Sequence, residues 1–229
     1  MTTAQLRLHH ALDALDAAGS TTRPGPPVHG CEHCWTAQDF ALLTGPADLV
    51  PNELLRRAAM KSWDLWDDFP TLYRRLAPRI LREFSTGRLI ADGPLIASRL
   101  LTARWREWPH AELVTEVLDA WWSATLEDPE PPRSVPEVLE TVATTTGTLT
   151  PWLRTWADTA TVTADRHLAD ALERWLPQGE VLDLKFGFYG ELEVGAELTQ
   201  WLLSLPPGRI GADQRYWLDL VIFHCRQDI

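Results

Sequence analysis

The sequence predicts an all-α protein, an irregular multi-helix bundle or α-α superhelix of about ten helices built from antiparallel hairpins. Three observations support this fold class. Apolar residues recur at helical spacing along most of the chain, and clusters of proline and glycine divide it at short intervals. Residues 178–190 are the least helical part and are expected to form a short extended piece or a loop. No fixed repeat period is present, so a regular solenoid is not supported.

The strongest helical pattern lies in the middle of the chain. One broad apolar face is formed by Leu113, Val114, Val117, Leu118, Trp121 and Trp122. A second stripe covers residues 94–108, with Pro94 at a first helical position and Pro109 as the stop. Because the connection between the two stripes is short, we expect an antiparallel hairpin with tryptophans of both helices in the shared interface.

Helix ends in the N-terminal half follow from caps and breakers. Residues 3–18 are predicted as a first helix that Gly19 terminates. Thr36 and Asp39 fit a cap, although the usual capping-box partner is Glu or Gln. Pro78 lacks a backbone donor and clashes with the preceding turn, so we expect a new helix to begin there.

The run of prolines and acidic residues between 127 and 134 predicts a linker between two regions, 1–127 and 134–229, that pack as one compact unit. Beyond it, Ser134 and Glu137 form a capping-box pattern, and Gly147 suits a left-handed helix stop. Thr150 is predicted to cap a helix that Pro151 starts, and Thr163 to open the next one. The last two helices are predicted over residues 191–205 and 212–226.

The charge of the chain is divided unevenly. With 229 residues, of which 45% are apolar, the chain can bury a substantial core, and its net charge is −11. Residues 1–107 hold 13 Lys and Arg against 12 Asp and Glu, whereas residues 108–229 hold 8 against 20. An acidic surface repels phosphate backbones, so nucleic-acid binding is disfavoured.

Localisation follows from the terminus and the cysteines. The N-terminus lacks the apolar core of a secretion signal, and no run of residues is long enough to cross a bilayer. Three cysteines without a disulfide-framework spacing agree with a reducing compartment. We therefore expect a cytoplasmic protein that has no membrane partner.

The sharpest local motif is the segment HGCEHCW. A tetrahedral zinc site uses cysteine and histidine, and the candidate ligands are His29, Cys31, His33, Cys34 and Cys225. A dithiol redox pair is an alternative, because Cys34 lies just before a predicted helix start, but the strand-helix pattern of thioredoxin-like proteins is absent. In the third interpretation, the two cysteines are reduced and pack like small apolar residues beside Trp35.

No other pattern predicts catalysis. The carboxylate pairs Asp67–Asp68 and Glu191–Glu193 are interpreted as turns or solvated faces, and no phosphate loop, nucleophile elbow or HExxH motif is present. Most of the basic residues are spaced as the solvated sides of amphipathic helices. This series is Arg56, Arg57, Lys61, Arg74, Arg75, Arg79, Arg82, Arg88, Arg99, Arg104 and Arg106.

Three segments within residues 28–127 resemble an uncharacterised family of bacterial proteins from actinobacteria and proteobacteria. They are a Cys-x-x-Cys-aromatic motif (Cys31, Cys34, Trp35), a Pro-Arg-Ile-Leu segment (Pro78 to Leu81), and a Trp-Pro hairpin leading to paired aromatics (Trp105, Trp108, Pro109, Trp121, Trp122). In this sequence Ala77 stands where similar proteins often have a bulky apolar residue. The resemblance implies a helical fold and transfers no activity or catalytic residue.

Three functions remain open. The leading hypothesis is a non-enzymatic interaction protein whose acidic surface binds another, basic protein, as acidic inhibitors of toxic enzymes do. The second is a zinc or thiol protein built on Cys31 and Cys34. The third is an enzyme acting on a small molecule in a tryptophan-lined pocket between residues 105–122 and 152–175, although core packing explains the tryptophans more simply.

Overall fold

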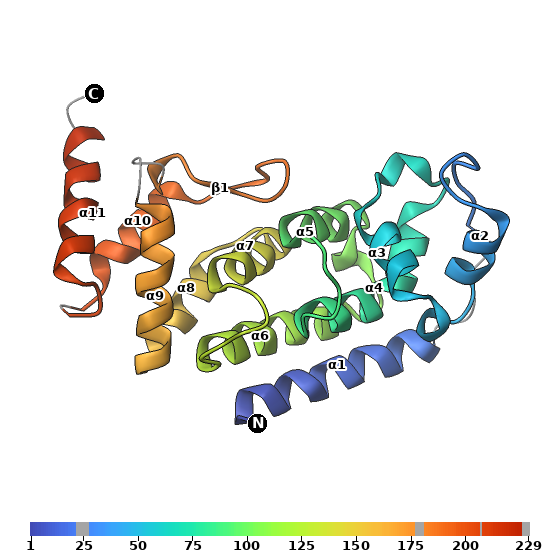
Figure 1. The fold of residues 1–229 in the computed structure, drawn as a ribbon, viewed down its shortest axis with the longest axis horizontal. Coiled ribbons are helices and arrows are strands. Elements are labelled where there is room, and N and C mark those ends of the chain that lie inside the picture. The colour runs from blue at the N-terminus through green and yellow to red at the C-terminus, as the bar shows by residue number, and fades with distance from the viewer. Residues whose placement is uncertain (22–27, 177–180, 207, 226–229) are drawn as a thin grey trace. The chain divides into compact units, whose positions relative to one another are not determined.

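The computed structural model of the chain describes residues 1–21, 28–176, 181–206 and 208–225, and its fold is all-α (Figure 1). Within these residues, eleven α-helices carry almost all of the regular structure, as predicted. The described residues form two compact units, 1–124 and 125–229. None of the described helices has both the length and the apolar character that a membrane crossing requires.

Unit 1 is organised around its fourth helix. Its elements are α1 Thr3–Thr21, α2 Ala37–Thr44, η1 Ala47–Leu49, α3 Asn52–Met60, η2 Trp63–Leu65, α4 Phe69–Ser85, α5 Gly93–Thr102, η3 Trp105–Glu107 and most of α6 Ala111–Glu127. Helix α4 contacts α1, α2, α3, α5 and η1. Its apolar stripe, which includes Leu72, Leu76, Ile80 and Phe84, is at most 1% exposed. This stripe forms the centre of the unit 1 core.

Two predicted helix breaks in unit 1 are wrong. Pro78 lies inside the continuous helix α4, and Gly19 lies inside α1. The two residues meet, since a Cβ atom on Gly19 would approach Cγ of Pro78 to 3.0 Å. Burial of the α4 stripe outweighs the hydrogen bond that the proline removes, and the missing side chain of Gly19 leaves room for the ring.

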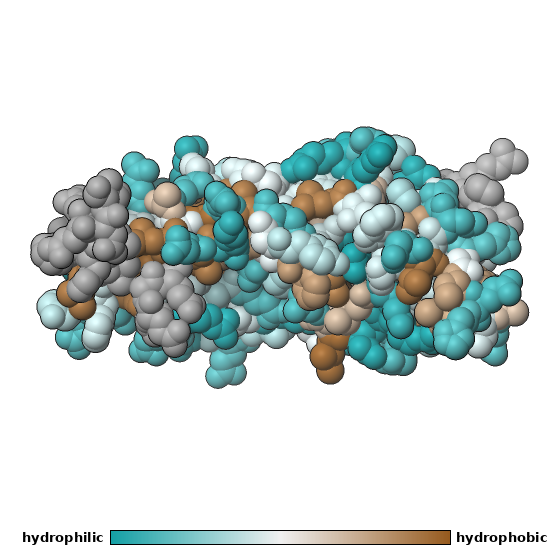
Figure 2. Space-filling model, turned by 90° about the horizontal axis from the view of Figure 1, so that it is seen from above, coloured by the Kyte–Doolittle hydropathy of each residue, from teal (hydrophilic) through white to brown (hydrophobic). Residues whose placement is uncertain are grey.

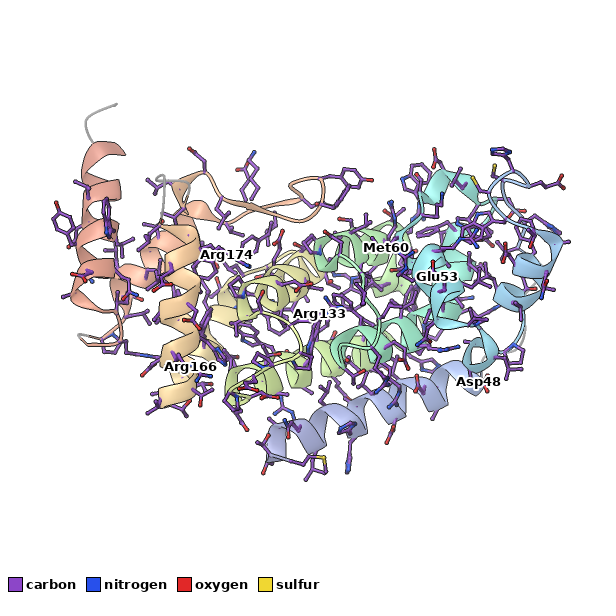
Figure 3. The ribbon with its side chains drawn as sticks, viewed as in Figure 1. Asp48, Glu53, Met60, Arg133, Arg166 and Arg174 are labelled. Carbon is purple, nitrogen blue, oxygen red and sulfur yellow. The ribbon has the colours of Figure 1, made fainter. Side chains whose placement is uncertain are left out.

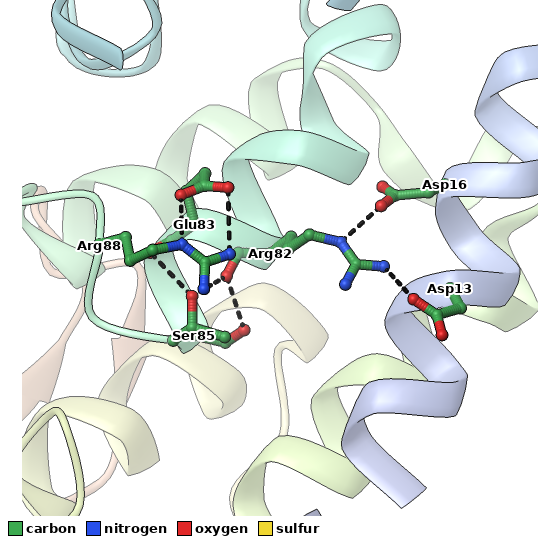
Figure 4. Close-up of polar contacts among 7 residues, drawn as sticks. Asp13, Asp16, Arg82, Glu83, Ser85 and Arg88 are labelled. Atoms are coloured by element: carbon green, nitrogen blue, oxygen red, sulfur yellow. Dashed lines mark hydrogen bonds and ion pairs between the residues drawn. The ribbon is translucent and has the colours of Figure 1, made fainter. Parts of the chain in front are cut away.

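Helix α4 is also fastened to α1 by charge. Nε of Arg82 lies 2.5 Å from Oδ2 of Asp16, and Nη2 lies 2.7 Å from Oδ1 of Asp13 (Figure 4). In the next position, Glu83 accepts two hydrogen bonds from Arg88, at 2.8 and 3.1 Å. Charged groups on this side of α4 are therefore paired.

The predicted helix over residues 94–108 is shorter in the structure. Helix α5 ends at Thr102, because Arg104 adopts a left-handed backbone conformation that stops the helix, and Trp105 lies in the separate turn η3. On α6, Trp121 packs edge-to-face on Phe84 of α4, with ring centroids 5.5 Å apart. This ring contact joins α6 to α4.

Unit 2 continues the helical architecture. Its further elements are α7 Val135–Thr146, α8 Thr150–Asp158, α9 Val162–Trp175, β1 Lys185–Phe186, β2 Leu192–Glu193, α10 Gly195–Ser204 and α11 Ala212–Cys225. Helix α7 contacts α8, α9 and β1, while α10 contacts α8 and α11 contacts α9. Trp156 is fully buried, with the rings of Trp175 and Trp201 at 6.2 and 5.6 Å. Tryptophans here form the core, as their helical spacing predicts.

Capping in unit 2 was predicted correctly at one end of α7 only. Gly147 ends the helix in the left-handed conformation, with φ of 62°. The predicted capping box at Ser134 is absent. The carboxylate of Glu137 instead forms an ion pair with Nη1 of Arg133 at 2.8 Å. Nη1 of Arg174 donates to Oγ of Ser134 at 3.5 Å. Arg133 and Arg174 are labelled in Figure 3. Helices α8 and α9 begin one or two residues away from the predicted caps.

Apolar side chains that reach the surface are scattered. Hydrophilic residues cover most of the face shown in Figure 2, and apolar residues form separate patches on it. Two tryptophans are half exposed, Trp63 in unit 1 and Trp217 in unit 2. Scattered apolar residues are common on protein surfaces, so position and surroundings decide whether one has a role. Trp63 lies at a cavity.

Candidate functional site

A cavity of about 420 Å³ lies in unit 1 between two segments with little regular helix. One segment runs from η2 into the first turn of α4, and the other from the end of α5 through η3. We call this cavity the aromatic pocket. It is lined by Trp63, Trp66, Asp67, Phe69, Pro70, Thr71, Arg74, Thr102, Ala103, Arg104, Glu107 and Trp108. Its volume falls in the range of small-molecule sites.

Two indoles of the aromatic pocket are held in place, that of Trp108 by a hydrogen bond and that of Trp66 by another ring. The backbone N–H of Trp66 donates to the carbonyl of Trp63 at 3.3 Å, and Nε1 of Trp108 donates to the carbonyl of Ala103 at 3.0 Å. The ring of Trp66 lies against that of Trp35, with centroids 4.6 Å apart. Rings fixed in this way offer a ligand preformed flat surfaces.

Charged groups surround the aromatic wall. Asp67 already has a partner, because its Oδ1 accepts the backbone N–H of His29 at 2.8 Å. Arg74 and Arg104 are exposed, and neither guanidinium forms an ion pair within the residues described. Arginine supplies hydrogen-bond donors that match oxyanions and stacks on rings. The pocket therefore combines apolar faces with cationic donors.

Arg104 holds an unusual backbone conformation at this site. Its φ of 54° and ψ of 45° are left-handed, and among the described residues other than glycine it alone has a positive φ. Gly87 has a φ of 76° just after α4, and Gly147 has 62° just after α7, where glycine avoids the steric cost. A side chain in this conformation costs about 1–2 kcal/mol. The strain coincides with the pocket.

The Cys-x-x-Cys segment borders the same wall. The backbone N–H of Cys31 donates to the carbonyl of Leu65 at 2.8 Å, and Gly30 pairs with Trp66 in a bridge. A Cβ atom on Gly30 would lie 2.4 Å from the carbonyl oxygen of Leu65, so this close approach requires glycine. The segment is thereby anchored to the residues that hold Trp66.

The two thiols of this segment interact with each other. Both cysteines are free and half-buried, and a turn brings the backbone N–H of Cys34 to the carbonyl of Cys31 at 2.9 Å. The backbone N–H groups of Cys34 and His33, and the thiol of Cys34, lower the pKa of Cys31. The hydrogen bond to Cys31 raises the pKa of Cys34. The pair is thus asymmetric, with Cys31 the better thiolate.

Positive charge lies next to the thiols. Nη2 of Arg57 donates to the carbonyl of Cys34 at 2.9 Å, and its guanidinium lies 4.8 Å from the ring centroid of Trp35. Lys61 adds a charge that favours the thiolate of Cys31. Arg57 also lies 3.7 Å from Asp39, whose side chain caps α2 together with Thr36. The predicted cap at Thr36 is therefore confirmed, with Asp39 in the place of the usual Glu or Gln.

The structure describes four of the five predicted zinc ligands. His33 is exposed, and the ring of His29 lies 6.2 Å from that of Phe40. The side chain of Cys225 lies outside the described residues. Within the described part of the chain, no group of three or more His, Cys, Asp or Glu residues could hold a metal ion. Zinc binding that includes Cys225 stays a prediction.

The aromatic pocket differs from the pocket considered from the sequence. Its indoles are Trp63, Trp66 and Trp108, whereas Trp152, Trp156 and Trp175 lie in the core of unit 2. The signal that could have found it is the pair of short segments WDLWDDF and WREWP. Each places two tryptophans beside acidic or basic residues and next to a proline, which favours a break between helices.

Comparison of the chain with protein-family models, with curated proteins and with solved structures finds no match. The resemblance to a bacterial family therefore stays a prediction. The same holds for the basic protein partner expected for the acidic half.

Proposed function

We propose that unit 1 binds a small organic molecule with a flat apolar part in the aromatic pocket. The observation that carries this proposal is a cavity of about 420 Å³ walled by three indoles. Core tryptophans of this chain pack against other side chains, but Trp63 is half exposed at the cavity. Ligand sites of this size are usually apolar clefts with a few polar groups that fix orientation.

The lining supports binding more than catalysis. Its polar side chains are Asp67, Thr71, Arg74, Thr102, Arg104 and Glu107. Histidine, cysteine and serine are not among the described lining residues, and neither lining threonine donates its hydroxyl to a carboxylate within the described part of the chain, so no nucleophile is paired with a base there. Asp67 already accepts a backbone hydrogen bond, and Thr102 donates to the carbonyl of Ser98 at 2.9 Å. The remaining donors, on Arg74 and Arg104, suit recognition.

Ligand titration of matched tryptophan variants tests this function. Aromatic and amphipathic metabolites are titrated into the wild-type chain by calorimetry, and binders are repeated on Trp63→Ala and Trp217→Ala. The two indoles are 50% and 54% exposed, so the substitutions have comparable effects on folding. We expect Trp63→Ala to weaken binding about tenfold or more and Trp217→Ala to leave it unchanged. Equal affinities of both variants, or no binder, would count against the pocket.

We propose thiol–disulfide exchange as a second candidate function, supported by the contact between the thiols of Cys31 and Cys34. The thiolate of Cys31 attacks a disulfide of a substrate protein, and one substrate sulfur leaves as a thiolate. Cys34 then attacks Cys31, the second substrate thiolate leaves, and a Cys31–Cys34 disulfide remains. Two electrons pass to the substrate, and the free thiols suit a cytoplasmic setting.

Single serine variants test the exchange. Because Cys34 resolves the mixed disulfide, Cys34→Ser is expected to accumulate a covalent adduct with a disulfide-bonded probe peptide, while Cys31→Ser forms none. Mass spectrometry of the intact protein measures both. Adducts on Cys34 in the Cys31→Ser variant at the same rate would show that the asymmetry between the thiols has no chemical consequence.

A further inference from the structure

Arg99 of helix α5 is a buried charge without a complete set of partners. Its residue is 3% exposed, and neither Nε nor Nη1 has a hydrogen-bond partner. It belongs to the basic series expected mostly on solvated helix faces, and here that expectation is wrong. Within the described residues no carboxylate lies within ion-pair distance of its guanidinium. Proteins rarely bury a charge unless it is paired.

Tyr73 of helix α4 adds a third unsatisfied donor nearby. The residue is fully buried, and its hydroxyl has no hydrogen-bond partner. Burial raises the pKa of Tyr73 strongly, and the charge of Arg99 acts in the opposite direction. The two residues lie on α4 and α5, which contact each other. The phenol is therefore a neutral O–H donor at ordinary pH. Two N–H groups and one O–H group share this part of the core.

These donors lie one side chain behind the aromatic pocket. The ring of Tyr73 packs on that of Phe69, with centroids 5.1 Å apart, and Phe69 lines the pocket. On the other helix, Arg99 lies one turn before Ala103, whose atoms also line the pocket. A ligand that reaches these donors from the pocket must therefore displace the buried ring of Phe69.

We propose that Arg99 and Tyr73 form an inner site for an oxyanion, a carboxylate or a phosphate, carried by the ligand of the aromatic pocket. This inference rests on the proposed binding function and specifies the class of its ligand. An oxyanion supplies the negative charge that Arg99 lacks, and its lone pairs accept from Nε, Nη1 and the phenol O–H. Because the site is enclosed, this pairing is much less sensitive to salt than a contact with Arg74 or Arg104.

Matched charged and uncharged probes test the site. Naphthoate, naphthyl phosphate and uncharged naphthamide are titrated by calorimetry at low and high salt into the wild type and variants. We expect the preferred oxyanion to bind about tenfold or more tighter than naphthamide. The arms with naphthoate and naphthyl phosphate distinguish the two oxyanion classes. Arg99→Met should remove the preference and leave the affinity for naphthamide unchanged.

The exposed arginines provide the control. Arg74→Gln and Arg104→Gln should retain most of the preference at high salt, because their charges are screened there. Tyr73→Phe, which removes one donor and keeps the ring, should lower the preference in part. It also serves as the second variant if Arg99→Met does not fold. A preference that survives both Arg99→Met and Tyr73→Phe, or that is absent from the wild type, overturns the inference.

Failure of the inference can be separated from failure of the pocket. Binding of naphthamide without an oxyanion preference would support the pocket and reject the inner site. If no probe binds, acetate and inorganic phosphate are tested alone by thermal unfolding. The inference then requires that one of them raises the melting temperature of the wild type more than that of Arg99→Met. Equal shifts would reject the inner site as well.

Discussion

Each unit of this protein buries an arginine, and the two arginines have opposite surroundings. Arg209 in unit 2, whose side chain is 10% exposed, lies 2.6 Å from Asp165 and donates to the carbonyls of Ala157 and Thr159 at 2.6 and 3.2 Å. These carbonyls belong to the end of α8, where helix carbonyls lack internal partners. Arg99 in unit 1 has two unpartnered nitrogens.

The difference separates a structural charge from a candidate binding charge. Arg209 neutralises an acid and completes a helix end, so its burial is compensated inside the protein. Arg99 has no such compensation, and the contacting helix α4 carries a second unpartnered buried donor, Tyr73. Uncompensated donors raise the free energy of the folded chain, and a ligand that pairs them lowers it.

The largest expected effect concerns the tryptophans of the two units. Trp156 in unit 2 is 0% exposed, and its Nε1 donates to the carbonyl of Ala164 at 3.1 Å. Trp156→Ala should lower the free energy of unfolding by about 4 kcal/mol, because it removes a large buried side chain and leaves a cavity. Trp63→Ala should change it by less than about 0.5 kcal/mol. Urea unfolding measures both, and similar losses would remove the distinction between core and pocket indoles.

The arginines themselves give the next largest effect. Arg209→Met should destabilise by about 3 kcal/mol, since Asp165 and two helix-end carbonyls lose their donor. Arg99→Met in buffer without carboxylate or phosphate should lose no stability and gain about 1 kcal/mol, because it removes an unpaired buried charge. Unfolding is measured in urea, because guanidinium chloride would add salt. A large loss for Arg99→Met would indicate a structural partner for this charge.

Sequence patterns predicted the fold well, because burial of apolar stripes determines it. Most of the predicted face on α6, Val114, Val117, Leu118, Trp121 and Trp122, is buried, and the all-α class is confirmed. Helix ends were less predictable, since they depend on single competing contacts. Glu137, the predicted partner of Ser134 in a capping box, pairs with Arg133 instead. Gly19 and Pro78 were both expected to end a helix, but they contact each other inside continuous helices.

The candidate site was only partly predictable. The Cys-x-x-Cys pair is visible in the sequence because its spacing is local. The aromatic pocket joins residues about forty positions apart in two non-helical turns, and periodicity carries no information about such turns. Arg99 was missed for a different reason. A basic residue in an amphipathic helix is normally solvated, so only the packing of α5 in the structure reveals its burial.

A smaller effect on the free energy of unfolding is expected at Arg104, which follows α5 and lines the pocket. Arg104→Gly should raise the free energy of unfolding by about 1 kcal/mol, because glycine adopts φ of 54° without steric cost. Gly87→Ala, at the matching position after α4, should lower it by a similar amount. Urea unfolding compares the two variants. If Arg104→Gly leaves the free energy of unfolding unchanged, the backbone of Arg104 is not strained and no strain is present at the pocket.

The smallest effect concerns paired charges at the surface of unit 1, which contrast with the unpaired charge in its core. Glu83 and Glu53 each accept two hydrogen bonds from an arginine, Arg88 and Arg56, but their side chains are 13% and 68% exposed. These bonds lower the pKa of both carboxyls from the ordinary value of 4.5. Because solvent screens the exposed pair more, Glu83 should contribute the larger share of stability.

The direction of the pH dependence follows from the lowered pKa. A carboxyl whose pKa is lower in the folded state stabilises the fold above its unfolded pKa, near 4.5, and loses that contribution as the pH falls through its folded pKa. Glu83→Gln should therefore reduce the melting temperature at pH 7 and converge with the wild type once the pH lies below the folded pKa of Glu83. Glu53→Gln should follow the wild type more closely throughout. The side chains of Arg88 and Arg56 are both partly exposed, so the two ion pairs differ mainly in the burial of the glutamate. Equal decreases in melting temperature for the two variants would mean that this burial does not determine the strength of the ion pair.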